Sequence, residues 1–209
     1  RCEPLSEGVN IKWLAMENMA AMQEKYTFAQ TVFDTLVQLY NLEDASRLQE
    51  LIIEETNINR EFNKKEYSRL RQKKGIISYR QFESVISRYQ MEVDDPQASL
   101  VPWKKYFTFS RDAEFIDAEY SSPELIALLF DIDLQTVKEW HSDLQKVSLS
   151  TFVNNNGGDY NARKNIIAGK KFLEESECTV SFKSAGGQYG FRFEYIKGEA
   201  KHFEFYGTK

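Results

Sequence analysis

The fold is decided by residues 179–206, which read TVSFKSAGGQYGFRFEYIKGEAKHFEFY. Aromatic residues alternate with polar ones here, which is the period-two pattern of a half-buried strand. Two turns, at Ala185-Gly186-Gly187 and at Lys197-Gly198, separate three such runs. The pattern predicts an antiparallel meander with one aromatic face turned inward. That face needs a cover, either from the helical part of the chain or from a helix that this sequence does not contain.

Before about residue 145 the spacing of the apolar residues becomes helical. Residues 28–39 follow the i, i+3, i+4, i+7 rule, and a second apolar set covers residues 48–55. Local capping signals mark four helix starts, because a side-chain oxygen there can accept a free amide of the first turn. These signals are Asp44, Ser78 with Gln81, Ser122-Pro123-Glu124, and Asp133. About six short helices and a meander predict the class α+β.

The amino-acid composition limits the classes of function that this chain can have. The chain has 209 residues, of which 42% are hydrophobic, so it can bury a sizeable core. Its 27 Lys and Arg against 32 Asp and Glu give a net charge of −5, which disfavours nucleic acid as a partner. A basic run (Lys64, Lys65, Arg69, Arg71, Lys73, Lys74) is interpreted as a solvated helix face. No apolar run approaches the roughly 18 residues that cross a bilayer.

The sequence contains no motif of a known catalytic site. His141 and His202 stand alone on different predicted elements, and no nucleophile elbow, P-loop or dinucleotide fingerprint occurs. Adjacent acids such as Asp94-Asp95 and Glu54-Glu55 arise by chance in an acidic chain. We therefore predict no catalytic residue and no required cofactor.

Two features remain as candidate sites. The loop 154–161 offers oxygen ligands in Asn154, Asn156 and Asp159, which is compatible with calcium, although no Glu falls where an EF-hand needs it. Its other interpretation is a polar surface loop. Cys2 and Cys178 are too far apart in sequence for a CxxC motif. Either both are free thiols, or a disulfide joins the N-terminus to the C-terminal third in an oxidising compartment.

The order of segments resembles the K-type minor pseudopilins of bacterial type II secretion systems. The similarity extends over nearly the whole chain through soft structural motifs. At two positions, Asp117 and Glu119, the chain has acids where the family usually has asparagine, and the family's glycine is missing around residues 85–89. The similar segments are Glu7–Leu14, Leu36–Asp44, Gly75–Phe82, Tyr106–Phe109, Phe115–Phe130 and the closing strands from Phe172 to Tyr206.

The resemblance implies a pilin-like antiparallel sheet with a large inserted all-helical domain. Residues 1–14 and 143–209 would form the pilin-like region, and residues 15–142 the insertion. The protein would be a non-enzymatic subunit that caps the tip of the pseudopilus and nucleates its assembly with other minor pseudopilins, in support of protein export. It would be anchored in the inner membrane, on the periplasmic side, by an N-terminal helix that this sequence lacks.

Two other functions stay open at this point. The helical part is also compatible with a SAM-like or helix-hairpin-helix-like module that binds nucleic acid or a protein partner, although its helix junctions lack the glycine-rich turns of hairpin DNA binders. The third alternative is an enzyme of an unrecognised type, which would need titratable groups clustered in a pocket.

Overall fold

A computed structural model describes residues 1–56, 75–110, 112–169, 174–184 and 187–208. The basic run at residues 64–74 lies outside the described residues. The chain divides into a sheet unit, residues 1–8 and 113–209, and a helical unit, residues 9–112. Each unit is described by itself below. No helix in the described ranges is long and apolar enough to cross a membrane.

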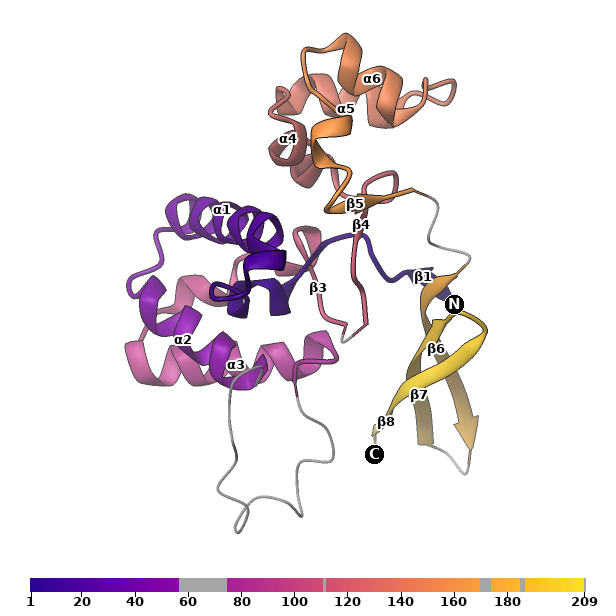
Figure 1. The fold of residues 1–209 in the computed structure, drawn as a ribbon. Helices are drawn as coiled ribbons and strands as arrows, with labels where there is room; N and C mark the ends of the chain where they lie inside the picture. Colours follow the sequence, from indigo (N-terminus) through magenta and orange to yellow (C-terminus); the bar gives the residue numbers. More distant parts are fainter. Residues whose placement is uncertain (57–74, 111, 170–173, 185–186, 209) are drawn as a thin grey trace. The chain divides into compact units, whose positions relative to one another are not determined.

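The sheet unit is built on four antiparallel strands in the order β1-β6-β7-β8 (Figure 1). The strands are β1 (Cys2–Pro4), β6 (Glu175–Ser184), β7 (Gly187–Ile196) and β8 (Glu199–Thr208). Lys197 and Gly198 both have positive φ, at 49° and 86°, which suits the two-residue turn between β7 and β8. The predicted α+β class with an antiparallel sheet is confirmed.

Strand β1 joins the N-terminal residues to β6. Cys2 pairs with Cys178 in the register of β1 and β6, and a disulfide links their sulfur atoms at 2.00 Å. Of the two states that the sequence left open for these cysteines, the structure has the disulfide. Backbone bonds extend the pairing on both sides, from the Thr179 amide to the Arg1 carbonyl (2.8 Å) and from the Leu5 amide to the Glu175 carbonyl (3.3 Å).

Three helices belong to the sheet unit: α4 (Pro123–Phe130), α5 (Leu134–Ser142) and α6 (Leu149–Asn155). The side chains of Ser122, Asp133 and Ser148 each accept the amide three residues on, so each helix begins at a cap. Two short strands of the same unit, β4 (Ile116–Asp117) and β5 (Ile167–Ala168), pair with each other in parallel. The shared core of the three helices contains Leu125, Ile126, Leu129, Val137, Leu149 and Val153, all almost fully buried.

The helical unit contains α1 (Gln23–Tyr40), α2 (Ala45–Thr56) and α3 (Tyr79–Val93), with the short parallel pair β2 (Val9–Asn10) and β3 (Phe107–Thr108). The turn of 3-10 helix at Ile11–Ala15 follows β2, and others lie at Ala20–Met22, Pro96–Ser99 and Trp103–Lys105. Aromatic rings fill the core, with Phe82 5.3 Å from Trp103 and 4.7 Å from Phe109 between ring centroids. The Ser78 hydroxyl accepts the Gln81 amide (3.3 Å), as the predicted capping box requires, while the Gln81 side chain accepts the Ile77 amide.

A buried tyrosine and aspartate tie the loops of the helical unit together, and we call this pair the Tyr89–Asp95 hub. The Tyr89 hydroxyl donates to Asp95 Oδ2 (2.9 Å) and accepts the Asp44 amide (3.1 Å). The Asp95 carboxylate also accepts the amides of Glu43 (3.1 Å) and Gln97 (2.9 Å). Tyr89 and Asp95 are at most 1% exposed. The hub therefore fixes the α1–α2 connection against the end of α3.

The domain boundaries implied by the resemblance, at residues 15 and 142, stay a prediction, and the two units are divided elsewhere. Residues 113–142 were expected in the helical insertion, but they lie in the sheet unit. Two contacts of β4 hold them there. Ile116 pairs with Ile167, and the Asp117 amide donates to the Ser6 carbonyl at 2.7 Å.

Candidate interaction surface

The meander presents one uncharged face, which we call the aromatic face. Side chains alternate across a strand, and the register places Val180 opposite Phe191 and Phe191 opposite Phe205. Rings meet across the strands at centroid distances of 5.3 Å for Phe193–Phe203 and 5.6 Å for Phe191–Phe205. The aromatic face consists of Cys178, Val180, Phe182, Tyr189, Phe191, Phe193, Tyr195, Phe203 and Phe205.

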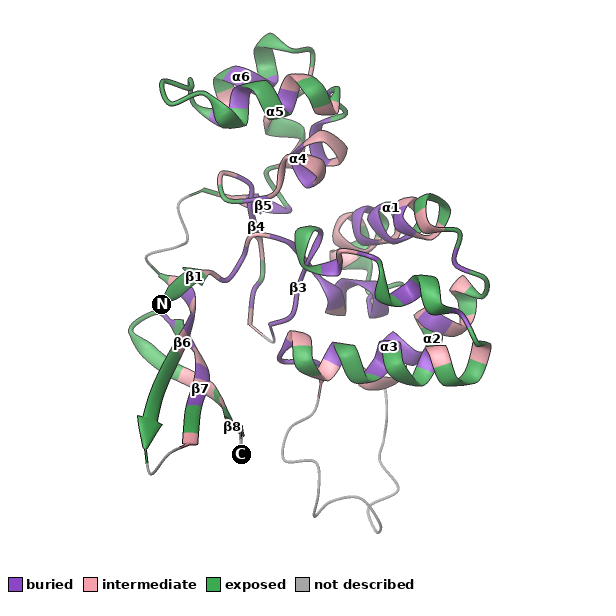
Figure 2. Ribbon diagram, turned by 180° about the vertical axis from the view of Figure 1, so that it is seen from behind, coloured by how far each residue is buried: buried purple, intermediate pink, exposed green. Residues whose placement is uncertain are grey.

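The aromatic face, which was predicted to turn inward under a cover, is largely exposed in the described chain. Phe205 is 73% exposed, Phe182 49% and Phe203 43%. Figure 2 shows that much of β6 is coloured as exposed, in contrast to the purple interior of α1. Alternation along a strand identifies the face that is apolar, but it does not say whether another element covers it. Large exposed apolar patches in soluble proteins mark interaction sites.

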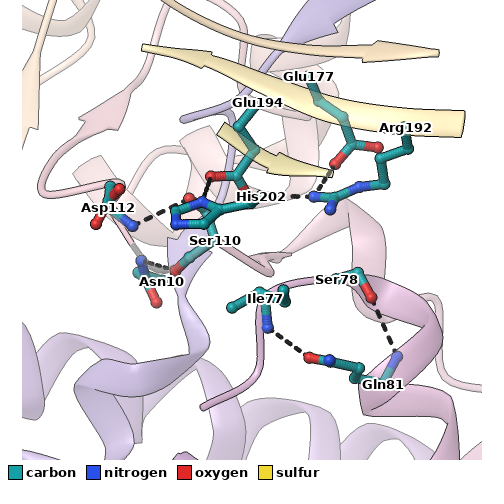
Figure 3. Close-up of polar contacts among 10 residues, drawn as sticks. All are labelled: Asn10, Ile77, Ser78, Gln81, Ser110, Asp112, Glu177, Arg192, Glu194 and His202. Carbon is teal, nitrogen blue, oxygen red and sulfur yellow. Dashed lines mark hydrogen bonds and ion pairs between the residues drawn. The ribbon is translucent and has the colours of Figure 1, made fainter. Parts of the chain in front are cut away.

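The opposite face of the same strands holds a charged network (Figure 3). Arg192 Nη2 lies 2.7 Å from Glu177 Oε2 and 3.2 Å from Glu194 Oε1, and Glu194 Oε2 lies 2.7 Å from His202 Nδ1. Glu194 is fully buried. Burial alone lowers the pKa of Arg192, but hydrogen bonds and charge from Glu177 and Glu194 outweigh it and leave that pKa raised.

A bulge in β8 places His202 in this network. The β7–β8 register runs from Arg192 opposite Glu204 to Glu194 opposite Lys201, so β8 contains one extra residue between them. His202 lies in that interval with φ of 51°. The network is a compact buried ion group that fixes the β7–β8 pairing. Nothing in its geometry identifies a nucleophile or a reacting atom.

The candidate calcium loop begins in the last turn of α6, which contains Asn154, and reaches the 3-10 turn at Asn161–Arg163. The side-chain Nδ2 of Asn156 donates to the Phe152 carbonyl (2.8 Å), and Asn154 Oδ1 accepts the backbone amide of Tyr160 (3.4 Å). Asp159 Oδ1 accepts the amides of Asn161 (2.9 Å) and Ala162 (3.1 Å). These groups cap the ends of their own local elements, as Asn and Asp often do. Calcium binding here stays a prediction.

The titratable groups singled out in the sequence are spread over different elements. His141 is on α5 beside Trp140, where burial and then Lys146 lower its pKa. Glu54 pairs with Arg88 on the surface of α2 and α3. Asp94 ends α3 in a left-handed conformation, and Asp95 belongs to the Tyr89–Asp95 hub. The absence of catalytic residues stays a prediction.

The sequence did not reveal the charged network, although a signal was present. Arg192 and Glu194 alternate with Phe191 and Phe193, which places the charges together on the face opposite the rings.

Comparison with protein-family profiles, with curated proteins and with solved structures finds no match to this chain.

Proposed function

We propose that this chain is a K-type minor pseudopilin, a non-enzymatic subunit that caps the tip of a type II secretion pseudopilus and starts its assembly. The observation that carries the proposal is the aromatic face. It gives the sheet an apolar, charge-free surface suited to packing against another protein element. The proposed partners are the other minor pseudopilins of the same secretion system.

The aromatic face offers apolar area that a partner can bury. Six of its side chains are between 38% and 73% exposed: Val180, Phe182, Tyr189, Tyr195, Phe203 and Phe205. Fully burying such a side chain stabilises by about 1.5–3 kcal/mol, so covering the exposed parts of all six supplies roughly 4–8 kcal/mol. This free energy is larger than the free energy that isolated contacts between surface side chains contribute. A partner without buried charges fits best, because an unpaired charge placed against these rings would lose its hydration.

The proposed position of this subunit at the filament tip is based on the number of helices that it carries in addition to its sheet. The chain carries two groups of helices, α1–α3 in the helical unit and α4–α6 in the sheet unit, in addition to its four-stranded sheet. In a helical filament a subunit with two added groups of helices leaves no room for another subunit above it. Such a subunit belongs at the end, where nothing is stacked on it.

The nucleic-acid alternative is disfavoured by the charges at the helix junctions. The α4–α5 turn is Asp131-Ile132-Asp133, and the α1–α2 turn runs from Asn41 to Asp44. The Asp133 carboxylate accepts the Thr136 amide (3.0 Å), and that hydrogen bond is the main cause of its lowered pKa. A hairpin that receives phosphate needs free amides and no carboxylate at this point.

The proposal is tested by mixing the chain with the soluble parts of the two other minor pseudopilins and measuring the mass of the complex by light scattering during gel filtration. Wild-type protein is expected to form a heteromeric complex, and Phe205→Asp is expected to weaken it at least tenfold. Leu144→Asp is the matched control, because Leu144 is fully exposed in the α5–α6 loop, away from the aromatic face. Equal loss in both variants, or full binding by Phe205→Asp, would contradict the proposal.

A further inference from the structure

Helix α6 ends in a turn that contains two adjacent glycines. The Asn156 amide donates to the carbonyls of Phe152 (3.2 Å) and Val153 (3.1 Å). Gly157 follows with φ of 84°, and the Gly158 amide donates back to the Val153 carbonyl at 3.0 Å. A left-handed residue followed by such a bond is the Schellman ending of a helix.

Both glycines are required at their positions, for different reasons. Gly157 has a left-handed conformation that L side chains rarely adopt. At Gly158 a Cβ atom would lie 2.8 Å from Val153 Cγ1 and 3.1 Å from the Phe130 carbonyl oxygen, so the backbone passes too close for a side chain. The fold therefore needs a glycine directly after Asn156, and this is the one Asn-Gly pair in the sequence.

We propose that Asn156 is a site of spontaneous chemical modification, with water as the only co-reactant. The Gly157 amide nitrogen forms a bond to Cγ of Asn156 and gives up its proton. The Cγ–Nδ2 bond breaks, and the side-chain nitrogen leaves as ammonia. Water then opens the resulting succinimide ring at either carbonyl, and the product at position 156 is aspartate or isoaspartate.

The reacting groups are accessible. Asn156 and Gly157 are both exposed, so water reaches them and ammonia can leave. Among the residues that the structure describes, the Gly157 amide has no hydrogen-bond acceptor. A Cβ atom on Gly157 would meet no other atom within 4 Å, so the space around the attacking residue is open.

The closed turn holds the two groups apart and slows the reaction. Asn156 has ψ of 21°, which turns the Gly157 nitrogen away from the Asn156 side chain, so ring closure needs a large rotation about the Cα–C bond. The Asn156 Nδ2 also donates to the Phe152 carbonyl at 2.8 Å, which fixes the side chain. The reaction therefore proceeds when the end of α6 opens, and its rate reports that opening.

The start of α6 controls how often its end opens. The helix has seven residues, and its first turn is closed by the Ser148 hydroxyl, which accepts the Thr151 amide at 3.3 Å. In so short a helix the cap is a large part of what keeps the backbone helical. Beyond the turn, Tyr160 stacks on Phe130 at 5.7 Å between ring centroids, so the chain is held again on the other side.

Both products weaken the turn. Isoaspartate lengthens the main chain by one carbon atom, which displaces the Gly158 amide from the Val153 carbonyl. Aspartate lacks the Nδ2 donor that bonds to Phe152, and it places a negative charge at the C-terminal end of α6, where the helix dipole disfavours it. The modification is therefore expected to loosen the end of α6 irreversibly.

The test is incubation of the whole folded chain at physiological temperature and mildly alkaline pH, followed by mass spectrometry of the tryptic peptide 147–163. EDTA is present throughout, so that no cation occupies the neighbouring loop. Asn156 is expected to exchange its side-chain NH2 for OH and to become a substrate of protein isoaspartyl methyltransferase, while Asn154 and Asn155 in the same peptide stay intact. An unchanged Asn156 after prolonged incubation, or equal reaction at the three asparagines, would overturn the proposal.

Two variants test whether the turn sets the rate. Ser148→Ala removes the cap and should speed the reaction of Asn156 about fivefold, and unfolding in urea should speed it further. Ser142→Ala is the matched control, because the Ser142 hydroxyl donates to the Glu139 carbonyl on α5 and should leave the rate unchanged. Equal rates in wild type, Ser148→Ala and urea would show that the turn does not restrain Asn156. This chemistry does not depend on the proposed function of the chain.

Discussion

The Tyr89–Asp95 hub offers a sharp test of what holds the helical unit together. Replacing Tyr89 by Phe removes one hydroxyl that donates to the Asp95 carboxylate and accepts the Asp44 amide. A hydrogen bond to a charged group contributes about 1.5–3 kcal/mol, and an amide left without a partner costs about 1 kcal/mol more. We expect Tyr89→Phe to lower the free energy of unfolding by about 2–4 kcal/mol at neutral pH.

The same substitution has a distinct dependence on pH. Burial, opposed by the Asp44 amide and reinforced by Asp95, raises the pKa of Tyr89 to about 12 from an ordinary value of 10.0. The folded chain therefore holds this proton to higher pH than the unfolded chain. The stability that the neutral hydroxyl provides is complete below pH 10 and is lost as pH rises toward 12. About two pKa units correspond to about 3 kcal/mol.

Urea unfolding followed by circular dichroism at several pH values between 7 and about 12 measures both effects. The stability difference between wild type and Tyr89→Phe should be largest at neutral pH and should shrink above pH 10. Tyr40→Phe is the control in the same unit, because the hydroxyl of Tyr40 makes no hydrogen bond to the described residues. A difference that stays constant through pH 12, or an equal loss in the control, would refute the reasoning.

Two further predictions concern the sheet unit. Asp131 ends α4 with φ of 53°, so Asp131→Gly should raise the free energy of unfolding by about 1 kcal/mol. Asp131→Asn removes only the charge at the helix C-terminus and should raise it by less. Thermal melts that rank the two variants the other way would contradict this prediction. Arg192→Met leaves Glu194 buried without its cation and should cost about 3–5 kcal/mol by urea unfolding. Glu177→Gln, at a half-buried position, should cost under about 1 kcal/mol, and similar losses in the two variants would show that Glu194 does not depend on Arg192.

Helix starts could be predicted from the sequence because their determinants are local. Ser78, Ser122 and Asp133 each accept an amide three residues away, so the capping residue and its partner lie within one turn. Helix α6 was not located, because its apolar set is only Leu149, Phe152 and Val153. The Ser148 cap would have revealed it.

Features that depend on distant pairing could not be predicted in the same way. The burial of Glu194 requires the register of β7 against β8 and the bulge that brings His202 to it. The placement of residues 113–142 depends on β4, whose contacts reach Ser6 and Ile167. The period-two pattern gave the aromatic face, but exposure of that face depends on elements that the pattern does not describe.

The central proposal is that this chain is a minor pseudopilin and that it assembles with the other minor pseudopilins through the aromatic face. Its most direct test replaces Phe205 by a photoreactive phenylalanine analogue, illuminates the mixture with those partners, and maps the crosslinked peptides by mass spectrometry. The claim predicts crosslinks from position 205 to a partner subunit and none from the same probe at Leu144. Crosslinks from position 144 alone, or none from either position in a mixture that forms a complex, would contradict it.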